Sequence, residues 1–487
     1  MGDEIGLDVV KKRAVKGVAV LTGRTFVLKL IEFFSFGLLW AFLDPSQYGV
    51  FLIASATVNF LSYFADIGLG AALIQKKEVP QEVDYRTVFT VQEILVSVIF
   101  IIVLLLGPVL TKTHSLTHEG LMLLYALGGS FFLASLKNIP SIQLERKLEF
   151  GKFIIPQVLE NMVYSVVVVF FAWKGFGITS FTYAVLIRGV VGLIAIYILN
   201  PWKPGLGFNL KSFKNLIKFG IPYQLNNFLA TVKDDGMIIV LGGILGTVGV
   251  GILGTAKKLA EYPLRFFMDN VTKVTFPAFS RMQDDKAELE KSLTRSIFFI
   301  CALVFPSLIG LVVVFPVLIA VIPRYAKWSP AYIPLIFLSV NSLWAAGSTQ
   351  LTNFLNSVGK IKTTFKLMIM WTALTWALVP VLSIKFGVNG AAFSYLLIGS
   401  SSVVVFYIVK KYLNWSIYHS VIVPLLSSLV MGGAIFILRN ILLINNVKTL
   451  VIMILAGGLT YLGFLYLVLG NSLVDDVKKI YFSVLKK

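Results

Sequence analysis

Residues 248–275 read VGVGILGTAKKLAEYPLRFFMDNVTKVT, a stretch that is long enough to span a membrane and yet contains five charges between Lys257 and Asp269. Each charge costs about 2.5–3.5 kcal/mol at the centre of an inserted helix. Each apolar residue returns only about 0.3–0.6 kcal/mol. The sum does not favour insertion with these charges facing lipid. One side of this helix must therefore face protein or water.

The rest of the chain has the composition of a membrane protein. Of its 487 residues 57% are hydrophobic and 14% are charged, whereas about a quarter of an ordinary soluble protein is charged. The apolar runs do not alternate as barrel strands would. We therefore predict an all-α polytopic membrane protein with about 14 transmembrane helices. The predicted spans lie near 17–43, 48–74, 87–110, 119–138, 153–173, 178–199, 217–244, 248–275, 295–322, 330–355, 364–384, 388–409, 420–440 and 447–469.

The formal charge of +19 does not indicate nucleic-acid binding, because most of the Lys and Arg residues lie in alternate connecting segments. This positive-inside distribution predicts that both termini are cytoplasmic. Two basic segments, SIQLERKLEFGKF (141–153) and the final VDDVKKIYFSVLKK (474–487), have the pattern of amphipathic helices at the headgroups or of solvated helices.

A weak internal repeat suggests how the spans are organised. A shift of 202 residues aligns FLDPSQYGVFLIAS (42–55) with ILGTVGVGILGTAK (244–257), and it places Glu32 on Asp234. Six spans per copy give two lobes of the same orientation, related by an axis along the membrane normal. We predict an N-terminal lobe at 1–215, a second lobe at 216–412, and two added helices with an amphipathic tail at 413–487.

Four predicted spans carry a polar face, because residues three and four apart share one side of a helix. In 248–275 that face holds Lys258, Glu261, Tyr262, Arg265 and Asp269, with Lys257 beside it. The other three faces hold Arg24, Lys29 and Glu32 in 17–43, Asn59 and Asp66 in 48–74, and Asn226, Asn227, Lys233 and Asp234 in 217–244.

Three interpretations of these faces remain open. The charges could reach the membrane interface from a helix end. They could close into ion pairs, such as Glu261–Arg265 and Arg265–Asp269, that only hold helices together. They could instead line a water-filled cavity between the two lobes, which is the interpretation that we prefer.

Several short patterns resemble cofactor or metal motifs, but their positions in the chain do not support such sites. GVGILG (249–254) matches a dinucleotide-binding pattern, but it lies between two spans with no strand before it. Its glycines fit a tight turn and close helix contact better. His114 and His118 lack a third metal ligand and are interpreted as polar loop residues, and Cys301 is the single cysteine. We predict no cofactor, no metal site and no enzyme activity.

The stretch FLDPSQYGVFLIASATVNFLSYFADIGLGAALIQKK (42–77) resembles the polysaccharide-transporter branch of the multidrug/oligosaccharidyl-lipid/polysaccharide exporter superfamily. Four other stretches fit the same resemblance: SIQLERKLEFGKF, KFGIPYQLNNFL, FPAFSRMQDD and NFLNSVGKIKTTFK. It implies two six-helix lobes around a cavity, and movement of undecaprenyl-diphosphate-linked sugars to the outer leaflet of a bacterial or archaeal cytoplasmic membrane. In relatives that flip the peptidoglycan precursor, basic residues of spans 1 and 8 bind the diphosphate. Arg24, Lys257, Lys258 and Arg265 match them in type and span, whereas Ser46–Gln47 depart from the usual acidic pair.

The resulting hypothesis is a lipid-linked oligosaccharide flippase that works by alternating access. Its predicted diphosphate-binding residues are Arg24, Lys29, Lys233, Lys257, Lys258 and Arg265. The predicted polar cavity residues are Asn59, Asn226, Asn227 and Tyr262. Coupling to a proton or sodium ion is assigned to Glu32, Asp66, Asp234 and Glu261. An ion-coupled multidrug exporter of the same fold is the alternative, whereas a membrane glycosyltransferase would need a large extramembrane loop that the sequence lacks.

Overall fold

The structure is a computed structural model that describes residues 7–65, 67–114, 116–441 and 446–470. Among these residues it contains helices and no strands, and 12 of the helices are long and apolar enough to cross a membrane. The predicted all-α polytopic membrane fold is thereby confirmed. The chain divides into two compact units, unit 1 (Met1–Gly251) and unit 2 (Ile252–Lys487).

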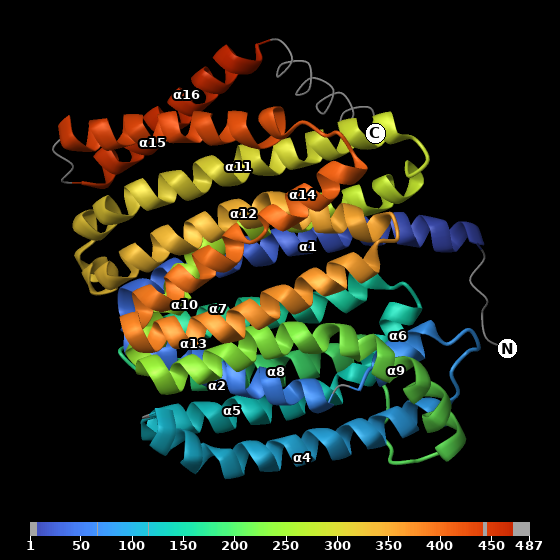
Figure 1. The fold of residues 1–487 in the computed structure, drawn as a ribbon. Coiled ribbons are helices and arrows are strands. Elements are labelled where there is room, and N and C mark those ends of the chain that lie inside the picture. The colour runs from blue at the N-terminus through green and yellow to red at the C-terminus, as the bar shows by residue number, and fades with distance from the viewer. Residues whose placement is uncertain (1–6, 66, 115, 442–445, 471–487) are drawn as a thin grey trace. The chain divides into compact units, whose positions relative to one another are not determined.

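Unit 1 is built from long helices that lie side by side, joined by short connections (Figure 1). In chain order its elements, long and short, are α1 (Leu7–Phe42), α2 (Pro45–Ala65), α3 (Leu69–Gln75), α4 (Glu82–His114), α5 (His118–Leu136), α6 (Asn138–Arg146), α7 (Phe150–Trp173), α8 (Thr179–Leu199), α9 (Leu210–Thr231), the π-helical turn η1 (Val232–Gly236) and the first part of α10 (Met237–Arg281). The main packing pairs are α1 with α7, α7 with α8, α5 with α8, and α4 with α5.

Unit 2 continues with the remainder of α10 and has the same character. Its elements are α11 (Lys286–Val321), the 3₁₀ helix η2 (Pro323–Ala331), α12 (Tyr332–Ser357), α13 (Ile361–Ser400), α14 (Val403–Tyr412), the π-helical turn η3 (Tyr418–Ile422), α15 (Val423–Ile441) and α16 (Val447–Leu469). Here α11 packs against α12 and α15, and α15 also packs against α16. Residues 420–440 and 447–469 are therefore helical, as predicted.

Two glycines reconcile the 12 long helices with the fourteen predicted spans. Gly246 within α10 has φ 65° and ψ −177°, and Gly387 within α13 has φ 60° and ψ −142°. Neither conformation is helical, and positive φ is readily adopted only by glycine. Each long element thus consists of two helices joined at one residue, which accounts for both additional spans.

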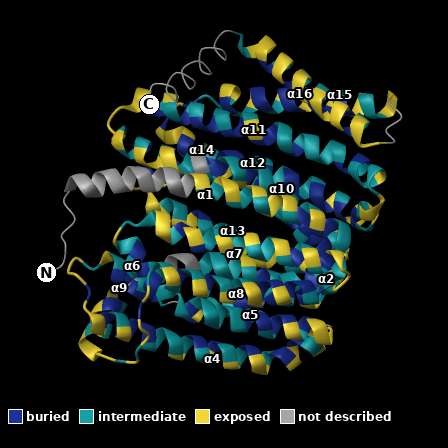
Figure 2. Ribbon diagram, turned by 180° about the vertical axis from the view of Figure 1, so that it is seen from behind, coloured by how far each residue is buried: buried dark blue, intermediate teal, exposed yellow. Residues whose placement is uncertain are grey.

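The apolar surfaces of the helices are as expected for lipid contact. In the most apolar part of α1 17% of the residues are buried, against 50% in α2. Exposed residues are spread along the helices of both units rather than confined to loops (Figure 2). Large side chains such as Leu467 (80% exposed) and Ile198 (74%) stand on these surfaces. A water-soluble protein would be expected to bury most such residues.

Each unit also has a buried apolar core. In unit 2 the main cluster runs from Leu264 and Met268 of α10 through α11 to Trp415, and it includes Cys301, which is 0% exposed. In unit 1 a cluster joins α3, α4, α6 and α9 at one end of the helices, around Leu73, Phe89 and Trp202.

Close backbone contacts between glycines hold α9 and the first part of α10 against α2 and α3 within unit 1. A Cβ atom on Gly251 would lie 1.8 Å from the carbonyl oxygen of Pro45, and one on Gly49 would lie 1.8 Å from that of Thr247. At the other end, a Cβ on Gly220 would lie 2.4 Å from the carbonyl oxygen of Ile67. Of the glycines in GVGILG, Gly251 serves close helix contact as predicted, whereas the turn expected within the motif lies just before it, at Gly246.

These contacts place α9 and the start of α10 in unit 1, so the boundary by packing lies at Gly251. The predicted lobes at 1–215 and 216–412 describe an internal repeat, and that division stays a prediction. The segment 141–153 is not one helix: α6 ends at Arg146, Leu148 has φ 55°, and α7 begins at Phe150. The predicted amphipathic tail lies outside the described residues.

Candidate functional site

The second part of α10 presents two different faces. Ala256, Ala260, Leu264 and Met268 recur every four residues and are buried (0%, 1%, 6% and 6% exposed). This stripe attaches the helix to the core of unit 2. Apart from Gly246, no residue in α10 departs from helical backbone angles, so the helix continues through Pro263 without the break that proline often causes. The charged residues consequently stay in register on the opposite face.

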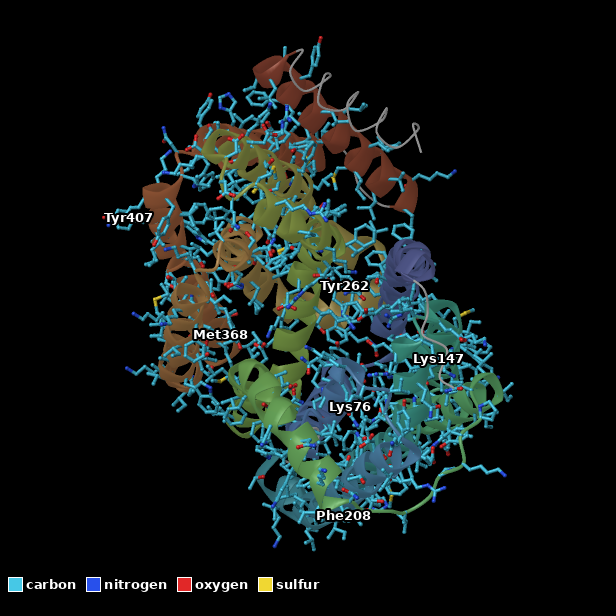
Figure 3. All side chains as sticks on the ribbon, turned by 90° about the vertical axis from the view of Figure 1, so that its right-hand side faces the viewer. Lys76, Lys147, Phe208, Tyr262, Met368 and Tyr407 are labelled. Atoms are coloured by element: carbon cyan, nitrogen blue, oxygen red, sulfur yellow. The ribbon has the colours of Figure 1, made fainter. Side chains whose placement is uncertain are left out.

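The cations on this face interact with aromatic rings and with one carboxylate. The ammonium of Lys257 lies 4.0 Å from Oε1 of Glu261 and 5.4 Å from the ring centroid of Tyr395 on α13. The ammonium of Lys258 lies 5.9 Å from the ring of Tyr262, which Figure 3 labels. A cation over a tyrosine ring gains roughly 0.5–1 kcal/mol or more and keeps its positive charge available to an anion.

Arg265 is exposed within its unit. Among the described residues no ion pair joins it to Glu261 or Asp269, the partners expected at four-residue spacing. The pair Lys257–Glu261 is long at 4.0 Å. The two pairs of Arg265 that a closed ion-pair lock would use are therefore not formed among the described residues, and that interpretation otherwise stays open.

A polar network fixes the adjoining part of α10 to α12. The side chain of Gln350, which is 0% exposed, donates to the Thr272 hydroxyl at 2.8 Å. Thr275 donates to the Gln350 carbonyl oxygen at 3.2 Å and accepts from Asn353 at 3.1 Å. These bonds leave the buried amide of Gln350 satisfied, and they fix the rotation of α10 about its axis.

In unit 1 the candidate residues of α1 have contrasting surroundings. Nε of Arg24 is buried and has no hydrogen-bond partner among the described residues. Lys29 is partly buried and Glu32 is exposed. A buried guanidinium donor without a partner costs free energy, and a bound anion would remove that cost.

Two other candidate residues lie on elements that pack against each other, α2 and η1. Asn59 is exposed on α2. Lys233 lies in η1 and pairs with the neighbouring Asp234 at 3.0 Å. π-Helical turns of this kind often occur at functional sites. The side chains of Asn226 and Asn227 on α9, and the whole of Asp66, lie outside what the structure describes.

One buried ionic cluster was not predicted from the sequence. Lys137, at the junction of α5 and α6, donates to Oε1 of Glu160 on α7 at 2.6 Å. Nε of Arg188 on α8 lies 3.8 Å from the other oxygen of Glu160. The side chains are 16%, 9% and 43% exposed for Lys137, Glu160 and Arg188. Arg188 is a charge within the predicted span 178–199, and Glu160 is the lone glutamate of the preceding span 153–173, so two opposite charges within neighbouring spans could have indicated the pair.

His114 is a correction to the interpretation of both histidines as loop residues. It ends α4, is 9% exposed, and its Nε2 lies 2.9 Å from the carbonyl oxygen of Ile239 on α10. The ring fits against Gly242, where a Cβ would lie 2.5 Å from it. His118 is exposed at the start of α5. Among the described residues no group of three or more metal-ligating side chains forms.

Comparison with known proteins gives a consistent result. A family model described as "Polysaccharide biosynthesis protein" matches residues 38–333. The succinoglycan biosynthesis transport protein ExoT of Rhizobium meliloti is 22% identical over 287 residues, which cover 58% of this chain and 56% of ExoT. The chain therefore matches just over half of the length of that relative.

A second relative and a solved structure cover more of the chain. The probable flippase AglR of Haloferax volcanii is 24% identical over 450 residues, 90% of this chain and 92% of AglR. The structure of the lipid II flippase MurJ in an inward closed conformation superposes with a TM-score of 0.75 at 17% identity, over 93% of this chain and 99% of that one. At this identity the structural likeness establishes the fold.

Proposed function

This chain belongs to the polysaccharide biosynthesis protein family, and we propose that it is a flippase for undecaprenyl-diphosphate-linked oligosaccharide. It would move this precursor of a cell-surface polysaccharide from the inner to the outer leaflet by alternating access. One relative is named as a transport protein and another as a probable flippase, which supports transport rather than catalysis. The distribution of Lys and Arg supports a cytoplasmic membrane location with both termini inside.

The observation that carries the proposal is the cationic face of α10. Lys258 and Arg265 follow the side opposite the buried Ala260–Leu264 stripe, and Lys257 lies at the edge of that cationic face. A diphosphate offers several anionic oxygens, and lysine and arginine bind such groups through charge-assisted hydrogen bonds. Two of these cations lie over tyrosine rings, and Lys257 also lies 4.0 Å from a carboxylate oxygen of Glu261.

Arg24 is the second diphosphate-binding residue in this proposal, because its buried Nε has no hydrogen-bond partner among the described residues. Lys29 and Lys233 would add positive charge, although Lys233 already pairs with Asp234. Asn59, Asn226, Asn227 and Tyr262 are assigned to sugar contacts in a polar cavity.

Energy for transport has two sources in this scheme. An anion that leaves a negative cytoplasm gains about 2.3 kcal/mol per charge at about 100 mV. The carboxyl groups of Glu32, Asp66, Asp234 and Glu261 are assigned to coupling with a proton or sodium ion, because a carboxyl that alternates between water and a drier surrounding gains and loses its counter-ion.

The test is binding of undecaprenyl-diphosphate sugars to the full chain in nanodiscs. We expect Lys257→Ala/Lys258→Ala to weaken binding about tenfold or more, since each charged hydrogen bond contributes about 1.5–3 kcal/mol. Lys291→Ala removes an exposed lysine of α11 and serves as the control. Unchanged affinity in the double variant would refute the diphosphate assignment and favour a multidrug exporter of the same fold. Transport in proteoliposomes that is indifferent to imposed pH and sodium gradients would remove the coupling role.

A further inference from the structure

Unit 1 contains a polar pocket at the end of its helices that is predicted to face the cytoplasm. It lies between the α3–α4 connection and the beginning of α9, and its volume is about 450 Å³. Figure 3 looks toward this end and labels Lys76 and Phe208 there. The volume is within the range of about 300–1,000 Å³ that is usual for small-molecule sites.

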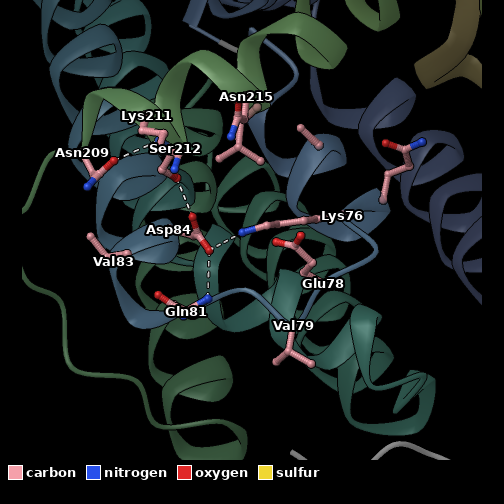
Figure 4. Close-up of a pocket in the computed structure, with 13 residues that line it drawn as sticks. Lys76, Glu78, Val79, Gln81, Val83, Asp84, Asn209, Lys211, Ser212 and Asn215 are labelled. Atoms are coloured by element: carbon pink, nitrogen blue, oxygen red, sulfur yellow. Dashed lines mark hydrogen bonds and ion pairs between the residues drawn. The ribbon is translucent and has the colours of Figure 1, made fainter.

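The wall of the pocket is held together by one buried carboxylate, Asp84, which is 4% exposed. Asp84 accepts hydrogen bonds from the ammonium of Lys76 at 2.7 Å, from the Ser212 hydroxyl at 2.5 Å and from the Gln81 backbone at 2.9 Å. Figure 4 shows these three bonds converging on it. They connect α3, α4 and α9, so the wall is rigid before any ligand arrives.

A second anchor supports the same connection from behind. The guanidinium of Arg146 on α6 donates to the carbonyl oxygens of Leu73, Ile74 and Glu78 at 2.7, 3.1 and 2.7 Å. The connection between α3 and α4 is therefore fixed on both sides. Preorganisation of this kind lowers the entropic cost of binding.

The lining has the donors and acceptors of a site for a neutral, hydroxyl-rich group. Lys76 and Lys211 are balanced by Glu78 and Asp84, so the lining has no net charge. Exposed amides from α3, from the α3–α4 connection and from α9 also line it: Gln75, Gln81 and Asn215. The structure gives these three amide side chains no hydrogen-bond partner among the described residues. An amide donates and accepts at once, as a sugar hydroxyl does.

We propose that this pocket is a docking subsite for the sugar part of the lipid-linked substrate on the side where the substrate is loaded. The inference rests on the proposed flippase function and adds the sugar-recognising surface to it. The balanced charge makes the pocket unsuitable for the diphosphate, which requires an excess of cations. Exposed Val79 and Val83 (69% and 40%) provide apolar surface for the C–H face of a sugar ring.

The experiment compares lipids with and without sugar on the full chain in nanodiscs. The probes are undecaprenyl diphosphate and undecaprenyl diphosphates that carry one to three sugars. The variant is Gln75→Leu/Asn215→Leu, which removes two exposed amides and leaves Asp84 and its partners intact. The matched control is Gln283→Leu, an exposed glutamine of unit 2 outside the pocket.

We expect wild type to bind at least one sugar-bearing probe more tightly than the sugar-free lipid. In the double variant this gain should fall about tenfold, from the loss of two hydrogen-bonding groups, while binding of the sugar-free lipid and the behaviour of the control stay unchanged. A gain that persists in the variant, an equal loss for both lipids, or no gain in wild type would overturn the subsite. Failure of wild type to bind either lipid would instead refute the proposed function itself.

Discussion

Replacing Glu160 by glutamine tests whether the buried ionic cluster of unit 1 stabilises the fold. The change removes the negative charge that lies 2.6 Å from the Lys137 ammonium, and it leaves that cation 16% exposed without a counter-ion. Breaking a buried pair from one side costs about 3–5 kcal/mol. We expect the free energy of unfolding to fall by about 3 kcal/mol.

The assay is reversible unfolding of the full chain in mixed micelles, with Glu160→Gln, Lys137→Met and the double variant compared in one thermodynamic cycle. Lys137→Met in the Glu160→Gln background should recover part of the loss, with a coupling of at least about 1 kcal/mol. Glu82→Gln, which breaks the exposed pair with Arg86 at 3.2 Å, is the control and should change stability little. A loss below about 0.5 kcal/mol for Glu160→Gln, or no coupling, would refute the reasoning.

Three further predictions concern stability. Gly251→Val should lower the yield of monodisperse protein sharply, because its Cβ would lie 1.8 Å from the Pro45 carbonyl oxygen, whereas Gly433→Ala, with nothing within 4 Å, should not; equal yields would contradict the close contact. His114→Phe keeps a flat ring but loses the bond from Nε2 to a backbone carbonyl, so unfolding should become easier by about 1 kcal/mol; no change would mean that the bond adds nothing. Burial raises the pKa of Glu145 on α6, so the carboxyl proton is bound more tightly in the folded state than in the unfolded state. The stability that this proton contributes is present below the ordinary glutamate pKa and is lost as the pH rises through the raised pKa. The difference in unfolding free energy between Glu145→Gln and wild type should therefore favour the variant more at pH 7 than at pH 4. A difference that does not depend on pH would argue against burial as the cause.

The fold was largely predictable because span length and hydrophobicity are local properties of the sequence. The tight junctions at Gly246 and Gly387 fell between predicted spans for the same reason. The break between α2 and α3 was not predicted: Gly68 has φ 75° and its place is set by contact with Gly220. A contact between residues so far apart in the chain leaves no local signal.

The candidate site was predictable only as far as helix periodicity reaches. It placed Lys258 and Arg265 on one face of α10, and the structure has them opposite the buried stripe. Helix periodicity did not predict partners on other helices, as Glu160 and Asp84 show. The reason is that the pairing of helices depends on the whole fold. The roles of the predicted site residues stay predictions.

The position of the single cysteine has a practical consequence. Cys301 lies in the core of unit 2 with 0% of its surface exposed, so a water-soluble thiol reagent should not modify it in the folded protein. Any cysteine introduced elsewhere would then be the sole reactive thiol. The natural chain can thus serve directly as the parent for site-specific labelling and for disulfide trapping of the proposed transport cycle.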